Sequence, residues 1–270
     1  MGLTATILGS AQDGGLPQVG AGHPNDDAAR SGAIQSRTAS SVAVASDGAT
    51  LLLDASVDLR AQLAATGIIP SGIALTHAHM GHYAGLLHLG REAWAADRLP
   101  VWCTPSMAGY LERNAPWSRL VSERHIVPQR VEPGEAFRWE GEEVRLIGVP
   151  HRQEHSDTVA ISVGGVLYLP DIDSWEEWPE AEATVAGHAV ALLDATFWSA
   201  AELPHRDLSA IRHPLVPDTL DRFGPLAAER RIVLTHLNHT NPLCDPGAPE
   251  HAVVAAAGIG VASDGMPLLQ

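Results

Sequence analysis

The chain has 270 residues, of which 45% are hydrophobic and 18% are charged, and its formal net charge is −15. That apolar fraction is enough to build a core and excludes a disordered chain, while the longest apolar runs fall short of the roughly 20 residues that a membrane span requires. The 17 basic residues against 32 acidic ones produce a negative field, which opposes binding to nucleic acid.

Short apolar segments predict strands along most of the chain. These segments are residues 4–8, 41–45, 50–54, 72–76, 101–103, 124–127, 136–139, 144–149, 158–163, 166–169, 190–193 and 232–234. The helical spacing of apolar residues predicts helices at 58–65, 84–95 and 218–229, and Pro105 with Ser106 opens another. Asp47-Gly48 predicts a hairpin between its two flanking strands. The Gly-, Pro- and Asp-rich residues 12–32 form a loop that we expect near a site or on a rim.

The order of these elements predicts an α/β fold. A β-rich half is followed by a half that alternates strands and helices, and no break in composition separates them. We therefore expect one domain over residues 1–270, in which two packed sheets carry helices on their outer faces. Cys103 and Cys244 are interpreted as reduced thiols, and the first residues lack the pattern of a secretory signal. We expect a cytoplasmic protein without a membrane partner.

Three histidines lie within six residues, directly after the predicted strand 72–76. They form the motif H-x-H-x-x-H at His77, His79 and His82. Neutral imidazole is the commonest side-chain metal ligand, and a loop from a strand to a helix can aim three rings at one point. Three neighbouring imidazoles would repel one another when protonated, whereas a divalent ion makes their grouping favourable. The motif therefore predicts a metal site.

Three further ligand-type residues follow other predicted strands. They are His151 after residues 144–149, Asp171 after residues 166–169, and His236 after residues 232–234. Polar residues at the ends of strands are where sites of α/β proteins gather. We expect these side chains to join the three histidines of the motif.

In order and spacing, these six residues resemble the metal-binding motifs of the metallo-β-lactamase superfamily. Residues 9–18, 37–41, 103–105 and 236–242 are similar to the branch of that superfamily that holds the pyrroloquinoline-quinone biosynthesis B protein. The resemblance implies a four-layer αββα sandwich, one or two divalent metal ions, and a small-molecule substrate. Zinc is the expected ion, and iron and manganese are the alternatives.

The resemblance also assigns roles residue by residue. It implies a first metal held by His77, His79 and His151, and a second held by His82 and His236. It further implies that Asp171 bridges the two ions and belongs to the catalytic machinery. His213 corresponds weakly to a histidine that assists the leaving group in relatives that cleave phosphodiesters; a solvated loop histidine is the alternative.

One position departs from the superfamily pattern. Where an Asp usually precedes the last histidine of the motif, this chain has Gly81. Without that carboxylate the second ion binds more weakly, so occupancy by one metal becomes an alternative. We consider Asp173, His155 and Asp194 as substitute ligands or as residues that orient a ligand, and for Asp194 a helix cap is the other interpretation.

Three residues near the predicted site are candidates for substrate binding. Arg37 can hold a carboxylate or a phosphate, although a surface ion pair explains it equally well. Asn238 and His239 follow His236 in a polar turn, where bonds that build the turn are the alternative role.

We weigh three functions. The first is a metal-dependent hydrolase that directs a metal-bound hydroxide at an ester, a lactone or a phosphodiester. The second is an iron-dependent hydroxylase or other oxidoreductase of cofactor or natural-product biosynthesis, because two histidines and a carboxylate also form the facial triad of non-haem iron oxygenases. The third is a non-catalytic protein that uses metal only for structure. A homodimer is compatible with the sequence, which does not determine the oligomeric state.

Overall fold

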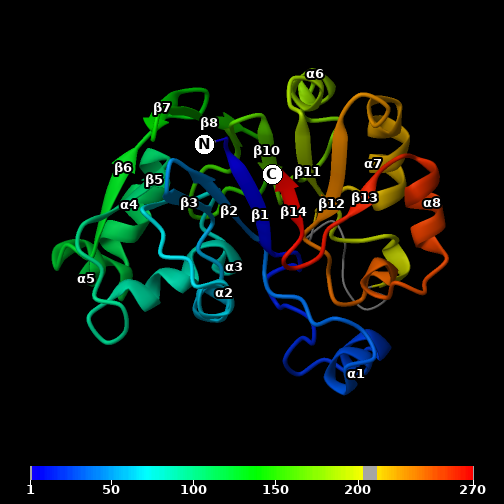
Figure 1. The fold of residues 1–270 in the computed structure, drawn as a ribbon, viewed down its shortest axis with the longest axis horizontal. Coiled ribbons are helices and arrows are strands. Elements are labelled where there is room, and N and C mark those ends of the chain that lie inside the picture. Colours follow the sequence, from blue (N-terminus) through cyan, green and yellow to red (C-terminus); the bar gives the residue numbers. More distant parts are fainter. Residues whose placement is uncertain (1, 203–211, 270) are drawn as a thin grey trace.

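The structure is a computed structural model that describes residues 2–202 and 212–269. Within these residues the strands form two seven-stranded sheets that pack face to face, with helices on their outer sides (Figure 1). The predicted four-layer αββα arrangement is confirmed.

The first sheet has the strand order β14-β1-β2-β3-β4-β5-β6. Its strands are β1 (Thr4–Gly9), β2 (Ser41–Ser46), β3 (Ala49–Leu53), β4 (Gly72–Ala74), β5 (Leu99–Cys103), β6 (Ile126–Arg130) and β14 (Pro267–Leu269). Strands β3 to β6 run parallel, so their carboxyl ends lie at one edge of the sheet. The predicted hairpin joins β2 and β3, and both Asp47 and Gly48 have the positive φ of its turn.

The second sheet has the strand order β13-β12-β11-β10-β9-β8-β7. Its strands are β7 (Ala136–Trp139), β8 (Glu142–Gly148), β9 (Val159–Val163), β10 (Val166–Leu169), β11 (Val190–Asp194), β12 (Arg231–Thr235) and β13 (Gly260–Val261). Strands β10 to β13 run parallel, which again brings the carboxyl ends of the strands to one edge.

Helices cover the outer face of each sheet (Figure 1). Those beside the first sheet are α2 (Leu59–Thr66), α3 (Met80–Tyr83), η1 (Ala84–Leu89), α4 (Pro105–Arg113) and α5 (Trp117–Ser122). Those beside the second sheet are α6 (Ala181–Ala186), α7 (Val216–Phe223), η4 (Gly224–Leu226) and α8 (Glu250–Ala256). The remaining helices are α1 (Pro24–Ser31), η2 (Ala200–Glu202) and η5 (Pro242–Cys244).

The core between the two sheets is built from the inward side chains of both. Ile7 and Leu51 of the first sheet belong to one buried cluster with Leu146, Ile161 and Tyr168 of the second. Each aliphatic side chain of this kind contributes roughly 1.5–3 kcal/mol when it is fully buried. This packing holds the two sheets together, and the side chains that follow the strands can therefore meet at a shared edge.

Two predicted helices are shorter than the apolar spacing indicates. The segment 84–95 forms only the 3-10 helix η1, because Gly90 takes an extended conformation directly after it. The segment 218–229 forms α7 only as far as Phe223, because Pro225 has no N–H with which to continue an α-helix. Among the described residues, the helices are too short or too polar to cross a membrane.

Candidate metal centre

The ligand-type residues converge from the ends of strands in both sheets. His77, His79 and His82 lie in the segment that leaves β4, His151 follows β8, Asp171 follows β10, and His236 directly follows β12. The side chains of His77, His82, His151, Asp171 and His236 are buried. The structure therefore brings together all six residues that the resemblance implies as ligands.

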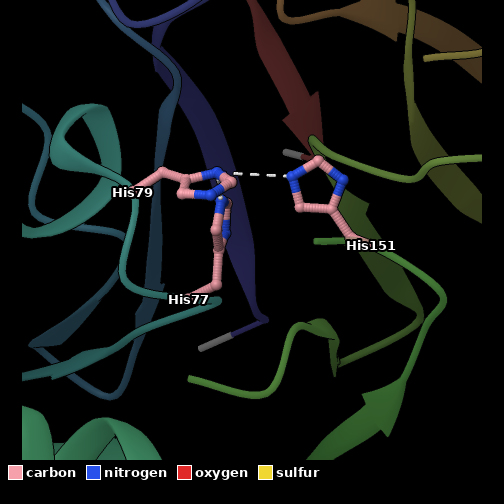
Figure 2. A group of neighbouring side chains, drawn as sticks. All are labelled: His77, His79 and His151. Carbon is pink, nitrogen blue, oxygen red and sulfur yellow. Dashed lines mark hydrogen bonds between the residues drawn. The ribbon is translucent and has the colours of Figure 1, made fainter. Parts of the chain in front are cut away.

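Three of the histidines, His77, His79 and His151, form a first group (Figure 2). His77 Nε2 lies 2.8 Å from His79 Nδ1, and His79 Nδ1 lies 3.3 Å from His151 Nε2. Nitrogen ligands at the usual bond lengths of tetrahedral zinc are separated by about 3.3 Å. These three nitrogen atoms can therefore hold one metal ion.

A second group consists of Asp13, His82 and His236. Asp13 Oδ1 lies 3.4 Å from His82 Nε2 and 3.6 Å from His236 Nε2, and these three atoms can also hold a metal ion. Asp171 lies between the two groups. Its Oδ2 is 2.9 Å from His82 Nε2, while its Oδ1 is 3.8 Å from His151 Nε2.

Buried polar atoms without partners point into the second group. Within the described residues, His82 Nε2, His236 Nε2 and Asp171 Oδ2 are buried and make no hydrogen bond. A buried donor or acceptor that lacks a partner costs about 1–3 kcal/mol, so such atoms need a reason to remain. A divalent cation would satisfy the two nitrogens and the carboxylate at once, so the donor set fits a metal.

The outer nitrogen of each of the five histidines lies beside another polar group; four of these pairs are hydrogen bonds, and the His151–Asp173 pair is close in distance without hydrogen-bond geometry. The pairs are His77 Nδ1 with the Thr76 hydroxyl at 3.0 Å, His79 Nε2 with Glu154 at 3.1 Å, His82 Nδ1 with Asp54 at 2.7 Å, His151 Nδ1 with Asp173 at 2.8 Å, and His236 Nδ1 with the Thr196 hydroxyl at 2.9 Å. Such partners fix the ring orientation and the tautomer of metal-binding histidines. The remaining nitrogen of every ring is thereby directed at the centre.

Charges at the centre separate the two groups. Burial lowers the pKa of His77 well below its ordinary value, and burial lowers the pKa of His151 to about 4, so both rings are neutral at pH 7. Burial also opposes charge on His82, but Asp54 and Asp171 outweigh it and hold the pKa of His82 well above its ordinary value. The surroundings of the second group therefore stabilise a positive charge between its side chains.

The missing carboxylate at Gly81 has a counterpart in space. A Cβ atom built on Gly81 would lie 2.1 Å from Asp13 Oδ1, so the Asp13 carboxylate occupies the volume into which a side chain at position 81 would project. Asp13 belongs to the glycine-rich loop after β1, which the sequence predicted to lie near a site.

The three residues considered as substitute ligands lie elsewhere. Asp173 contacts the outer nitrogen of His151, and Asp194 accepts hydrogen bonds from the backbone N–H groups of Ile172 and Thr196. The ring of His155 packs against Tyr110, with ring centroids 5.5 Å apart. The position left open by Gly81 is thus filled by Asp13 rather than by any of these three.

His213 is close to both groups. Its ring centroid lies 5.7 Å from that of His151 and 5.8 Å from that of His236, and its Nδ1 lies 2.6 Å from Asp194 Oδ2. Burial lowers the pKa of His213, but the Asp194 carboxylate outweighs it and the pKa is raised overall. The His213 side chain is therefore buried beside the centre and is not that of a solvated loop residue.

The three candidates for substrate binding are engaged within the protein. Arg37 is only 7% exposed, and its Nη1 donates to Ser10 Oγ and to the Ala262 carbonyl. Asn238 donates to the Thr240 hydroxyl in a turn. His239 Nδ1 lies 2.9 Å from the Asp26 carboxylate of α1. These contacts give each of the three side chains a partner within the protein, and substrate binding by them stays a prediction.

Sequence reasoning missed Asp13 and Asp54 as residues of the site. For Asp54 the available signal was a carboxylate at the end of the apolar strand β3. For Asp13 it was a carboxylate inside a glycine-rich loop, in a chain that lacks one at position 81.

Comparisons with known proteins agree with this geometry. Residues 49–237 match the model of the beta-lactamase superfamily domain. Coenzyme PQQ synthesis protein B of Nitrosococcus oceani is 29% identical over 97% of this chain and 98% of that protein. The protein of the same name from Cupriavidus taiwanensis is also 29% identical, over 98% of this chain and 99% of its own length.

Solved structures show the same likeness. Zn(2+)-bound PqqB from Methylobacterium extorquens superimposes with a TM-score of 0.87 at 26% identity, over 99% of this chain and 100% of that one. A diphosphatase from the PhnP family superimposes with a TM-score of 0.77 at 24% identity, over 99% of this chain and 97% of that one, and it shares the fold. The predicted resemblance to the PqqB branch is confirmed.

Proposed function

The chain belongs to the metallo-β-lactamase superfamily, and we propose that it is a hydrolase that cleaves an ester, a lactone or a phosphodiester in a small molecule. In this proposal the first group and the second group would each hold one divalent ion, with Asp171 as a ligand to both. Metal ions in such a pair lower the pKa of bound water and so supply hydroxide near neutral pH. Zinc suits these donors, as do iron and manganese.

The orientation of Asp171 is the observation that carries the proposal. Its Oδ2 lies 2.9 Å from His82 Nε2, 3.4 Å from His236 Nε2 and 3.8 Å from His77 Nε2, and its Oδ1 lies 3.8 Å from His151 Nε2. A carboxylate that lies against nitrogens of both groups suits a position between two cations. A site for a single ion would leave one set of buried nitrogens without a partner.

His213 is the residue we propose as the proton donor to the leaving group. Its Nδ1 contacts Asp194, so the proton that can be transferred lies on Nε2. Asp194 is fully buried and also accepts from the Thr196 hydroxyl, which holds the carboxylate in place. Asp194 thus acts as a positioning residue for His213.

The first experiment measures metal content and turnover together. Protein purified without added metal is expected to contain about two ions per chain and to hydrolyse members of a panel of aryl esters, lactones and bis(p-nitrophenyl) phosphate. His79→Ala serves as the control that lacks a ligand of the first group. Absence of turnover on the whole panel by a fully loaded protein would refute the hydrolase.

One substitution tests the proposed proton donor without removing a metal ligand. His213→Gln should retain both ions and lose about 10²–10⁴-fold in kcat on substrates with poor leaving groups. The loss should be much smaller for p-nitrophenol, which needs no proton in order to leave. Equal losses for both leaving groups would contradict the role.

A second candidate function rests on His82, His236 and Asp171. Asp171 Oδ2 lies 2.9 Å from His82 Nε2 and 3.4 Å from His236 Nε2, and two histidines with a carboxylate resemble the iron site of oxygenases. Relatives of this chain are PQQ synthesis proteins. An iron-dependent hydroxylase predicts about one iron per chain and turnover that stops without O2. Unchanged hydrolysis under anaerobic conditions excludes this candidate.

A further inference from the structure

We infer that Asp13 is the anionic ligand of the second metal ion and replaces the carboxylate that relatives carry at the position of Gly81. The inference rests on the two-metal site proposed above. It adds a residue from the opposite end of the sequence to that site, and it makes the glycine-rich loop after β1 part of the metal centre.

The position of the Asp13 carboxylate supports this role. Its Oδ1 faces the two nitrogen atoms of the second group, at 3.4 Å from His82 Nε2 and 3.6 Å from His236 Nε2. Both nitrogens are buried without hydrogen-bond partners in the described residues, and both rings are oriented by groups behind them. The three atoms together outline a position for one cation.

The Asp13 side chain is also partly open to solvent, with 36% of its surface exposed. The ligands Asp171 and His236 are almost fully buried. An open side at the second metal position leaves room for water or for a substrate atom, as a catalytic metal site requires.

The backbone around Asp13 is anchored where a ligand has to be held. Gln12 N–H donates to the Leu237 carbonyl at 2.9 Å, and Ala11 and Leu237 form an isolated parallel β-bridge. Leu237 directly follows His236, so the loop and the histidine are tied to each other. Gly15, at φ +65°, turns the chain back after Asp13, and its N–H donates to the Gln12 carbonyl.

A side chain at position 81 and the carboxylate of Asp13 would compete for the same space. A Cβ on residue 81 would lie 2.1 Å from Asp13 Oδ1 and 2.9 Å from Asp13 Cα, distances that real Cβ atoms do not show. A side chain at 81 and the carboxylate of Asp13 therefore cannot occupy the site together. The Asp13 carboxylate thus lies where a side chain at position 81 would project.

The test measures the binding of Zn2+ alone. Metal-free wild type and Asp13→Asn are titrated with Zn2+ against a chromophoric chelator, and ions per chain are counted after desalting. We expect the first ion to bind equally to both proteins. The second should bind more than about 100-fold more weakly to Asp13→Asn, beyond the range seen for residues that only orient a ligand.

Asp58→Asn is the matched control. Asp58 is a carboxylate beside the same loop, 3.9 Å from a Cβ built on Gly15, and it accepts from the Ala39 N–H without contacting the histidines. Its amide variant should bind two ions like the wild type. Equal binding of the second ion by wild type and Asp13→Asn would overturn the inference, whether or not the protein hydrolyses esters.

A second pair of variants guards against a folding defect. Gly81→Asp alone should lower the melting temperature of the metal-free protein, because the new Cβ collides with Asp13. Adding Asp13→Gly should restore that temperature and recover the second Zn2+. A double variant that folds but binds only one ion would contradict the exchange of positions.

The outcomes also separate this inference from the proposed hydrolase. Loss of the second ion in Asp13→Asn, with no hydrolysis by the wild type, upholds the ligand and refutes the function. If the wild type hydrolyses substrate and Asp13→Asn binds the second ion as tightly as the wild type does, the proposed function is upheld and the role of Asp13 as a ligand is refuted.

Discussion

The two halves of the metal centre are assembled in different ways. The first group takes two residues of one short motif and adds His151, and its buried histidines His77 and His151 are neutral. The second group draws Asp13, His82 and His236 from three distant parts of the chain, and the neighbouring carboxylates of Asp54 and Asp171 favour a positive charge on His82. His77 and His151 of the first group can therefore bind a metal ion without losing a proton. In the second group, His82 must release a proton before it binds a metal ion.

The most damaging change should be at the residue that the halves share. Asp171→Asn removes the negative charge between the groups, so we expect both ions to bind more weakly and kcat/KM to fall by more than about 1000-fold. Metal content and turnover measured on one preparation check this. Retention of both ions with full activity would show that the two halves are independent of Asp171.

Replacing a single histidine by alanine should remove the metal ion of one half and leave that of the other. His79→Ala should lose the first ion and keep the second, while His236→Ala should lose the second and keep the first, each by more than about 100-fold in affinity. Titration with Co2+, whose absorption reports its ligands, follows each site separately. Loss of both ions in either variant would mean that the centre binds them only as a pair.

The residues behind the histidines should give smaller effects of the same kind. Asp54→Asn should weaken the second ion and Asp173→Asn the first, each by about 10–100-fold, because these carboxylates orient His82 and His151. Chelator competition measures both affinities. Asp54 also accepts from the Thr76 N–H and hydroxyl, so its variant should lose about 1–3 kcal/mol of stability as well.

The pH dependence should be the mildest difference between the halves. His82 has a raised pKa, so it must release a proton before it binds a metal, and affinity for the second ion should rise about tenfold per pH unit up to that pKa. The pKa values of His77 and His151 are lowered, so affinity for the first ion should change little between pH 6 and pH 8. Calorimetry in buffers of different ionisation enthalpy counts the protons released. Equal proton release at both sites would contradict this contrast.

Most of the residues of the metal centre could be predicted from the chain alone. The motif at His77, His79 and His82 follows an apolar strand, and His151, Asp171 and His236 follow others, so local patterns placed each ligand at the end of a strand. The hairpin at Asp47-Gly48 was equally readable, because its turn demands two residues that tolerate positive φ.

The position of Asp13 in the second half was decided by tertiary structure. No local pattern reports that Asp13 and Gly81 share one volume, since 67 positions separate them in the sequence. The same holds for Arg37, whose contact with Ala262 joins residues that lie 225 positions apart in the sequence. Residue types and strand ends determined which chemistry this protein can carry. Only the packing of the two sheets and the anchoring of the loop at Leu237 decided which carboxylate reaches the metal, because contacts between distant segments depend on the fold and not on spacing.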